Sequence, residues 1–241
     1  MQYINSIKIN STIIEDQTYV SKLPIVKNLL EIKELKLDEN ITFFVGENGS
    51  GKSTILEAIA LICGLNAEGG SKDFNFATQV TNSELYKYMT PIRSTNREKD
   101  HFFLRAESFY NVASEIDRLH SQQYYGGKSL HDQSHGESFL ALIQNRFRGE
   151  GLYILDEPEA ALSPTRQLTL LCEMNRLIKN KSQFIIATHS PILLAFPKAT
   201  IYEVSGSSIT EVSYKDCEPY KVTKSFLDDP DRMLHYLLQE G

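Results

Sequence analysis

Apolar and polar residues alternate in two stretches near the start of the chain. Residues 3–9 alternate, and residues 29–37 alternate again with charged partners. A period of two predicts half-exposed strands, whereas the unbroken apolar run at residues 41–45 predicts a strand that is buried on both faces. The first 45 residues therefore predict a β-rich region that leads into one buried strand.

Short apolar runs and helical patterns alternate from residue 101 onwards. Such strands, when helices separate them, predict a mostly parallel sheet that is covered on both faces. The pattern also predicts a hairpin around Gly206. The expected strands are residues 101–106, 152–155, 184–187, 200–204 and 208–212, and the expected helices are residues 54–62, 107–120, 138–147, 164–180, 193–196 and 231–239.

The whole pattern predicts an α/β fold with an antiparallel N-terminal β region. We expect one domain over residues 1–241, with a helical and loop subregion at about residues 65–150. The closing helix at residues 231–239 has an apolar stripe, which predicts packing against the core, although a partner could also cover it. The stripe consists of Met233, Leu234, Leu237 and Leu238.

Composition narrows the class of protein. The 41% apolar content is enough for a sizeable core. No stretch approaches the ~18 apolar residues of a membrane span, and residues 1–10 lack the pattern of a signal peptide. The three cysteines have no metal-binding spacing and fit a reducing compartment. We therefore expect a cytoplasmic protein.

The negative net charge argues against a broad nucleic-acid-binding surface. The net charge is −6, whereas such binding normally requires a basic surface. Two local basic clusters exist, and we interpret both as solvated charged faces. They consist of Arg93, Arg97 and Lys99, and of Arg146 and Arg148.

A phosphate-binding motif, G-x-x-x-x-G-K-[ST], follows the buried strand and opens a helix. Its glycines allow a tight turn whose N–H groups form an anion-binding nest. Lys52 can reach the β- and γ-phosphates, and the Ser53 hydroxyl can bind Mg²⁺. The predicted nucleotide-binding residues are Gly46, Glu47, Asn48, Gly49, Ser50, Gly51, Lys52, Ser53 and Thr54.

Two adjacent carboxylates, Asp156 and Glu157, end the apolar strand at residues 152–155. This arrangement resembles a Walker B strand. Asp156 would then bind Mg²⁺, and Glu157 would act as general base on the attacking water. Alternation along a strand points the two side chains in different directions, so they can serve different tasks at one strand end.

Two further segments resemble those of ABC-type ATPases. Residues 133–138 (QSHGES) look like the signature L-S-G-G-Q, and Thr188-His189-Ser190 looks like the switch histidine. The motifs occur in the family's order and spacing. The whole chain therefore resembles an ABC-type P-loop ATPase, and residues 156–164 (DEPEAALSP) look closest to the stand-alone and SMC-like branch.

The resemblance implies a composite site made by two chains. Ser134 begins a helix, and in the family this helix tip, here with Gly136 and Glu137, completes the γ-phosphate pocket of the other protomer. His135 replaces a glycine and Glu137 a glutamine, which leaves the strength of that contact open. His189 would sense the γ-phosphate.

Two family positions have no clear match. Glu107 occupies the place of the Q-loop glutamine and could bind the metal, but it could equally start a helix. Tyr19 lies at a suitable distance to stack on adenine, although an ordinary strand aromatic is the simpler interpretation.

The leading hypothesis is a cytoplasmic ATPase that binds and hydrolyses ATP with Mg²⁺. It would work as an ATP-gated head-to-tail homodimer that drives an unidentified partner. The segment from Lys52 to Asp156 is too short for the coiled-coil rod of an SMC protein. The alternatives are the ATP-binding subunit of a membrane transporter and a regulatory ATPase linked to nucleic acid or to a defence system.

Overall fold

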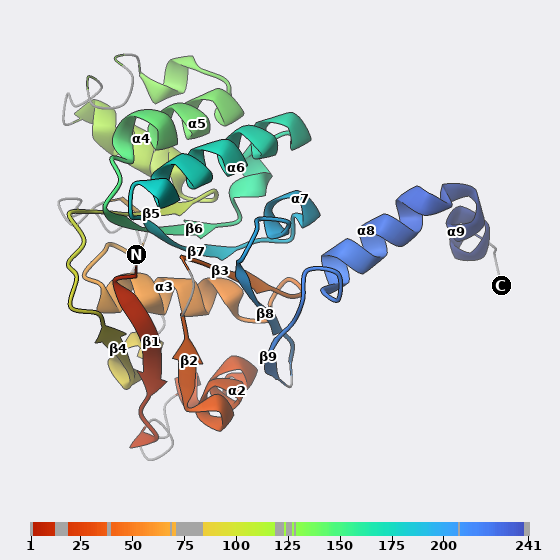
Figure 1. The fold of residues 1–241 in the computed structure, drawn as a ribbon, viewed down its shortest axis with the longest axis horizontal. Coiled ribbons are helices and arrows are strands. Elements are labelled where there is room, and N and C mark those ends of the chain that lie inside the picture. Colours follow the sequence, from red (N-terminus) through yellow and green to blue (C-terminus); the bar gives the residue numbers. More distant parts are fainter. Residues whose placement is uncertain are drawn as a thin grey trace.

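Two β-sheets and the helices around them form the body of the protein (Figure 1). The computed structural model describes residues 2–12, 19–37, 40–67, 69–70, 84–118, 123, 127, 129–206 and 208–238, except for the side chains of residues 19 and 20. The larger sheet has six strands in the order β5-β6-β7-β3-β8-β9. Neighbouring strands from β5 to β8 are parallel, and β9 is antiparallel to β8.

The strands of this sheet match the sequence prediction closely. Every residue of β3, β6 and β7 is buried, as expected for a sheet that is covered on both faces. The bounds are β3 Ile41–Val45, β5 Asp100–Arg105, β6 Gly151–Asp156, β7 Gln183–Ala187, β8 Thr200–Val204 and β9 Ile209–Glu211. The predicted mostly parallel α/β fold is confirmed.

The smaller sheet contains β1 (Ile4–Ile9), β2 (Glu34–Lys36) and β4 (Met89–Arg93). It is antiparallel throughout, with β1 in the centre. The buried Gln183 of β7 connects the two sheets, because its side chain accepts hydrogen bonds from the N–H groups of Tyr3 and Ile4 at 2.8 and 3.0 Å. The predicted antiparallel N-terminal region is also confirmed.

Helices cover the two faces of the larger sheet differently. Helix α3 (Lys52–Ile62) lies between the two sheets and contributes to the core that they share (Figure 1). Helices α4 (Phe109–Arg118), α5 (His135–Arg146), α6 (Pro164–Lys179) and α7 (Pro191–Leu194) contribute to the core on the opposite face. Short 3₁₀ helices are η1 Tyr19–Lys22, η2 Glu84–Tyr88, η4 Leu130–Asp132 and η5 Pro158–Ala161.

The strand predicted at residues 29–37 is largely wrong. Helix α2 (Pro24–Ile32) occupies its first half, and only Glu34–Lys36 forms a strand. Pro24 is suited to the first turn of a helix, and Ile25, Val26 and Leu29 bury one helical face. Lys33, with φ of 58°, ends the helix. The alternation therefore mixed the end of a helix with a short strand.

Other helix predictions differ less. Helix α5 begins at His135, three residues before the predicted start, and α4 and α6 lie within their predicted ranges. Five of the eleven residues of the loop predicted at residues 122–132 lie outside the described residues, and residues 130–132 of the remainder form η4.

The C-terminal stripe does not pack against the core, so that prediction is wrong. Helix α8 (Glu218–Asp228), which the sequence pattern did not reveal, precedes α9 (Pro230–Leu237), and neither helix has a buried residue. Leu237 and Leu238 are 68% and 72% exposed. The two helices extend away from the sheets (Figure 1). Within the described ranges, no helix combines the length and apolar character needed to cross a bilayer.

Candidate nucleotide-binding site

The predicted motifs meet at one edge of the larger sheet. The loop after β3, the carboxylates at the end of β6 and the segment after β7 follow neighbouring parallel strands. The N–H of Glu157 donates to Ala187 O at 2.9 Å, and the N–H of Thr188 donates to Phe44 O at 3.0 Å. Because the carboxyl ends of parallel strands share one edge, the topology gathers these segments there.

The loop at residues 46–51 has a backbone that requires glycine at two positions. Gly46 has φ of 152°, and a Cβ there would lie 2.0 Å from Val204 O. Gly51 has φ of 101°, and a Cβ there would lie 2.7 Å from the Ile25 side chain. A cavity of about 420 Å³ opens above the loop and is lined by Gly46, Glu47, Asn48, Gly49, Ser50, residues 203–206 and Glu218.

The Lys52 side chain is hydrogen-bonded to the backbone of this loop. Its side chain is buried, and its Nζ donates to Gly46 O at 2.8 Å and to Glu47 O at 2.9 Å. Burial lowers the pKa of Lys52, while Glu157 and Asp156 oppose that shift. The ammonium group therefore lies at the phosphate-binding turn and is held there by backbone carbonyls.

Ser53 and Asp156 lie together, as predicted. The Ser53 hydroxyl donates to Asp156 Oδ1 at 3.2 Å, and Asp156 is 5% exposed. Burial raises the pKa of Asp156 to about 6, and nearby Arg105 opposes the shift. A hydroxyl and a carboxylate are hard oxygen donors that fit Mg²⁺.

The described side chains alone do not complete a metal site. Among the described residues, no group of three or more His, Cys, Asp and Glu side chains could hold a metal ion. This fits a cation that also takes phosphate oxygens and water as ligands, as Mg²⁺ does in nucleotide sites.

Glu157 and His189 face each other at the open side of the edge. Glu157 has a left-handed backbone with φ of 51°, and its Oε1 lies 3.6 Å from His189 Nε2. Both side chains are about one-third exposed, at 35% and 34%. The N–H of His189 donates to the carboxylate of Glu159, which fixes the switch segment against η5. A carboxylate and an imidazole are thus available to one ligand.

The predicted signature segment forms a capped, accessible helix tip. Ser134 is the N-cap of α5 and is exposed. Its N–H and hydroxyl both donate to Glu137 Oε2, at 3.1 and 2.5 Å, which lowers the pKa of Glu137. Arg166 Nη2 of α6 lies 3.1 Å from Glu137 Oε1. The Ser134 donors at this helix tip are therefore occupied by the Glu137 carboxylate of the same helix.

Gly136 brings this helix into contact with the segment that follows Glu157. A Cβ on Gly136 would lie 2.8 Å from Ala161 O and 2.7 Å from Arg166 Nη1. Helix α5 thus packs directly on η5, so the predicted signature segment lies against the segment that follows Glu157 in the same chain.

Glu107 lies in the turn between β5 and α4, so it does not start the helix, which begins at Phe109. Its side chain is 85% exposed, and its Oε2 lies 3.8 Å from Arg105 Nη2. In addition to burial, its negative charge helps to raise the pKa of Asp156, which places it near the site, and its metal role stays a prediction. The Tyr19 side chain lies outside the described part of the chain.

Sequence reasoning missed three charged residues around the site: Arg105, Glu159 and Arg166. Arg105 Nε lies 3.3 Å from Asp156 Oδ2, and its side chain is only 18% exposed. The one available signal was a charged residue at the end of an apolar strand, where a side chain must be buried or reach the site. Glu159 and Arg166 had no signal beyond their proximity to Glu157 in sequence.

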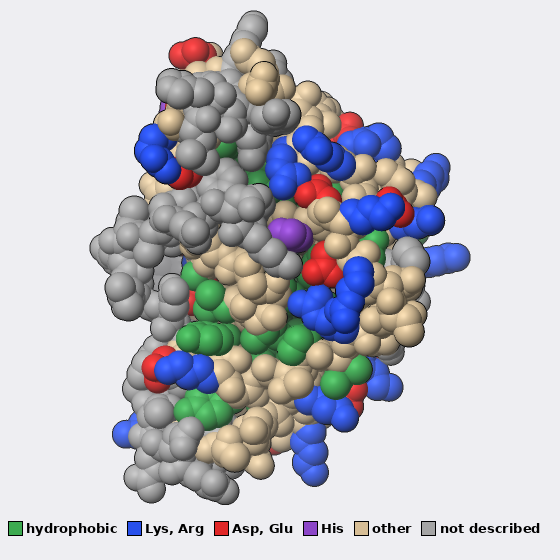
Figure 2. All heavy atoms as spheres, turned by 90° about the vertical axis from the view of Figure 1, so that its left-hand side faces the viewer, with side chains coloured by type: hydrophobic (Ala, Val, Ile, Leu, Met, Phe, Trp, Pro, Cys, Tyr) green, Lys and Arg blue, Asp and Glu red, His purple; other side chains and the backbone are tan. Residues whose placement is uncertain are grey.

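The basic clusters do not form a basic surface. Arg93 pairs with Glu98 at 3.2 Å, Lys99 with Glu150 at 2.7 Å, and Arg146 with Asp100 at 2.6 Å. Figure 2 shows acidic side chains interspersed among the basic ones on the face that it presents. Lys99, at 74% exposure, fits the predicted solvated charged face, whereas Arg93 and Arg146 are only 25% and 15% exposed and lie in largely buried ion pairs, so the prediction is wrong for these two.

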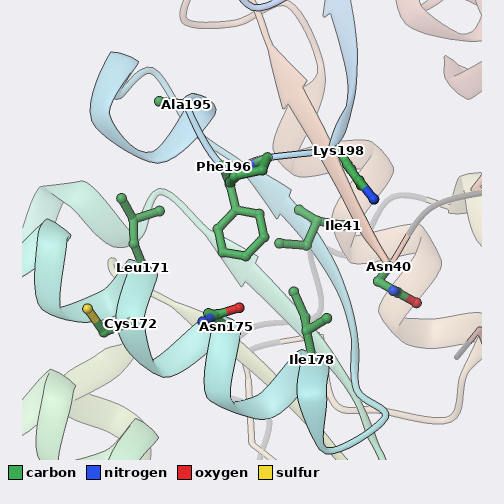
Figure 3. A pocket seen from close by; sticks show the side chains of 10 residues that line it. Asn40, Ile41, Leu171, Cys172, Asn175, Ile178, Ala195, Phe196 and Lys198 are labelled. Carbon is green, nitrogen blue, oxygen red and sulfur yellow. The ribbon is translucent and has the colours of Figure 1, made fainter.

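Two other cavities lie away from the loop. One, of about 490 Å³, lies at the opposite edge of the sheet, where Ile41 begins β3; Phe196, Leu171 and Ile178 border it (Figure 3). Another, of about 820 Å³, lies between α6, α7 and α8 and reaches Glu159 and His189. The first is remote from the predicted chemistry because the phosphate loop follows the other end of β3.

Two family models match the chain. One, described as "AAA domain", matches residues 26–144, and another, described as "AAA domain, putative AbiEii toxin, Type IV TA system", matches residues 129–195. The first contains the phosphate loop, and the second contains the signature, Walker B and switch segments.

Two solved structures resemble the chain at low sequence identity, and the first of them shares its fold. The structure of cbiO1 from Clostridium perfringens, part of the ABC transporter complex cbiONQ, is 16% identical with a TM-score of 0.51, and the match covers 98% of this chain and 99% of that chain. The SMC head domain from Thermotoga maritima is 16% identical with a TM-score of 0.43, over 75% of this chain and 93% of that chain.

Three observations point to the same class of protein: the motifs that meet at one sheet edge, the sheet topology and the two family models. The fold is that of an ABC-type P-loop ATPase, and the two family models, neither of which spans half of the chain, support assignment to that class.

Proposed function

We propose that this protein binds ATP with Mg²⁺ and hydrolyses it. The observation that carries the proposal is the convergence of Lys52, Ser53, Asp156, Glu157 and His189 at one edge of the sheet. Phosphate binding needs the loop and its lysine, and hydrolysis needs a base beside the position of the γ-phosphate. All of these groups are present and face the same region.

Each of these residues has a separate role in the proposed reaction. Lys52 exchanges the carbonyl oxygens of Gly46 and Glu47 for phosphate oxygens, so the buried ammonium keeps acceptors throughout. Ser53 and Asp156 would hold Mg²⁺, which neutralises phosphate charge when it is bound. Glu157 accepts a hydrogen bond from the attacking water and takes its proton. His189 donates to the γ-phosphate.

We further propose that two chains close head to tail around ATP. The exposed Ser134 tip supports this, because a helix N-terminus with a hydroxyl is an anion site. Glu137 occupies those donors in the isolated chain. Nucleotide-dependent closure therefore requires Ser134 to exchange the Glu137 carboxylate for the partner's γ-phosphate.

Substitution of the general base tests the hydrolytic part. Glu157→Gln keeps the shape of the side chain but removes the proton acceptor, so turnover of MgATP falls by about 10²- to 10⁴-fold while ATP binding persists. Phosphate release and nucleotide titration measure the two properties. Glu173→Gln on α6, where Glu173 pairs with Arg176, is the matched control and retains wild-type turnover. Full turnover of Glu157→Gln would contradict the assignment.

Two narrower functions each have one comparison in their favour. The description of cbiO1 as part of a transporter complex favours a transport subunit, and the AbiEii description favours a defence role. Co-purification with a detergent-solubilised membrane protein supports the first. Turnover that nucleic acid stimulates and that salt suppresses supports the second, although the paired basic residues above do not favour a broad nucleic-acid surface.

A further inference from the structure

Arg105 lies beside the proposed magnesium ligand in a fixed position. Arg105 and Asp156 are register partners on the neighbouring strands β5 and β6, so the backbone ladder sets their spacing. Nε of Arg105 lies 3.3 Å from Asp156 Oδ2. The two side chains are 18% and 5% exposed, so water screens this contact weakly.

Helix α3 holds both ends of this arrangement. Ser53 and Glu57 are four residues apart on α3 and therefore lie on one face of the helix. Ser53 donates to Asp156 Oδ1 at 3.2 Å, while Glu57 Oε2 accepts from Arg105 Nη1 at 3.2 Å. Ala67 O lies 3.5 Å from the same Nη1. The four side chains thus close a ring between the phosphate-loop helix and two strand ends.

Each oxygen of Asp156 has its own neighbour in this ring. Oδ1 faces Ser53 and Oδ2 faces Arg105. The guanidinium attracts Oδ2 while the Ser53 hydroxyl donates to Oδ1, and together these contacts favour the carboxylate orientation that keeps Oδ1 on the side of the serine. Asp156 Oδ1 and the Ser53 hydroxyl oxygen are the two oxygens that would bind Mg²⁺ in the proposed function.

The net charge of the ring is compatible with binding of a cation. A lone arginine beside Asp156 would cancel its negative charge and repel Mg²⁺. Glu57 is itself 14% exposed and faces the same guanidinium, so Glu57, Arg105 and Asp156 together keep one negative charge. The ring therefore fixes Asp156 without removing its attraction for a cation.

We propose that Arg105 is a positioning residue that orients Asp156 for the magnesium ion of the bound nucleotide, with Glu57 as its counter-charge. This inference rests on the proposed function. It assigns a role to two residues outside the P-loop, Walker B, signature and switch motifs, and it distinguishes this role from that of a simple ion pair between β5 and α3.

Nucleotide binding with and without metal tests the proposal. A fluorescent ATP analogue is titrated first in EDTA and then at rising Mg²⁺ concentrations. Arg105→Gln should bind the analogue in EDTA as the wild type does, but should need at least about tenfold more Mg²⁺ for the metal-dependent signal, in line with the effect of losing a group that orients a ligand. Arg105→Lys should restore part of the Mg²⁺ response, because it keeps the charge but not the fork.

Matched variants keep the result interpretable. Arg118→Gln removes an exposed arginine whose partner is Glu115, and should leave both titrations unchanged. Glu57→Gln retains Arg105 but removes its nearer counter-charge on α3, leaving Asp156 and the exposed Glu107 carboxylate, which lies 3.8 Å from Arg105 Nη2, and should also raise the Mg²⁺ requirement. It therefore tests the same ring if Arg105→Gln does not fold, which urea unfolding would reveal.

Two failures can be told apart. An unchanged or lower Mg²⁺ requirement in folded Arg105→Gln, with normal Mg²⁺ dependence in the wild type, would overturn the role of Arg105 alone. A wild-type protein that binds no nucleotide under either condition would overturn the proposed function and, with it, this inference.

Discussion

Asp156 shows how one buried carboxylate connects stability with function. Its environment disfavours the charged form, because burial raises its pKa to about 6 from an ordinary value near 4. Lys52 is subject to the same desolvation in the opposite direction, since burial lowers its pKa. A bound magnesium nucleotide would therefore stabilise charges that burial disfavours at this site.

The pKa of Asp156 predicts a stability change with pH. Between about pH 4 and 6 the folded protein holds a proton that the unfolded chain releases, so the free energy of unfolding falls as pH rises through this window. Asp156→Asn has no such titration, so it should gain on the wild type by up to about 3 kcal/mol between pH 4 and 7. Urea unfolding in EDTA measures this, and parallel pH curves for the two proteins would contradict it.

At the scale of elements, the contact between α5 and η5 is the feature that most directly connects two motifs. Gly136 allows the backbone of Ala161 to approach the signature helix. Arg166 then reaches from α6 to Glu137 at the tip of the same helix. The spacing of α5 from η5 therefore sets the position of Ser134 relative to Glu157.

Gly136→Ala tests this contact. The added methyl group would lie 2.8 Å from a backbone oxygen, so α5 must shift, and the free energy of unfolding should fall by about 1 to 3 kcal/mol. Turnover should fall as well, because the tip moves. Gly206→Ala is the stability control, since nothing lies within 4 Å of its Cβ position. Equal unfolding midpoints for the two variants would contradict the account.

The sequence predicted the elements of the site better than the elements around it. The loop after β3, the acidic end of β6 and the segment after β7 have motifs whose spacing depends on the chemistry, and all lie where the pattern indicated. The alternation at residues 29–37 failed because a helix end and a three-residue strand together imitate one strand. Arg105 was missed because its role depends on a register partner 51 residues away in the chain, Asp156.

At the scale of the whole molecule, the sheets and the C-terminal helices differ in how they are stabilised. The core on each face of the larger sheet is continuous, whereas α8 and α9 contribute no buried residue. An amphipathic stripe reports that a helix has an apolar face but not what covers it. This is why the stripe at Leu234 and Leu237 could not be assigned to the core from its period alone.

In the proposed mechanism, two chains share each nucleotide. Ser134 is exposed at the tip of α5, and Glu157 and His189 open to the surface at about one-third exposure. A second chain could therefore reach the site without unfolding any described element.

The oligomeric state of Glu157→Gln in MgATP tests this claim most directly, by light scattering. The mass should double from the 27.4 kDa of one chain when ATP is added, because hydrolysis no longer reopens the dimer. Adding Ser134→Glu should abolish the doubling through repulsion of phosphate, whereas Ser225→Glu on α8 should not. A Glu157→Gln protein that binds ATP and keeps the mass of one chain would contradict the account.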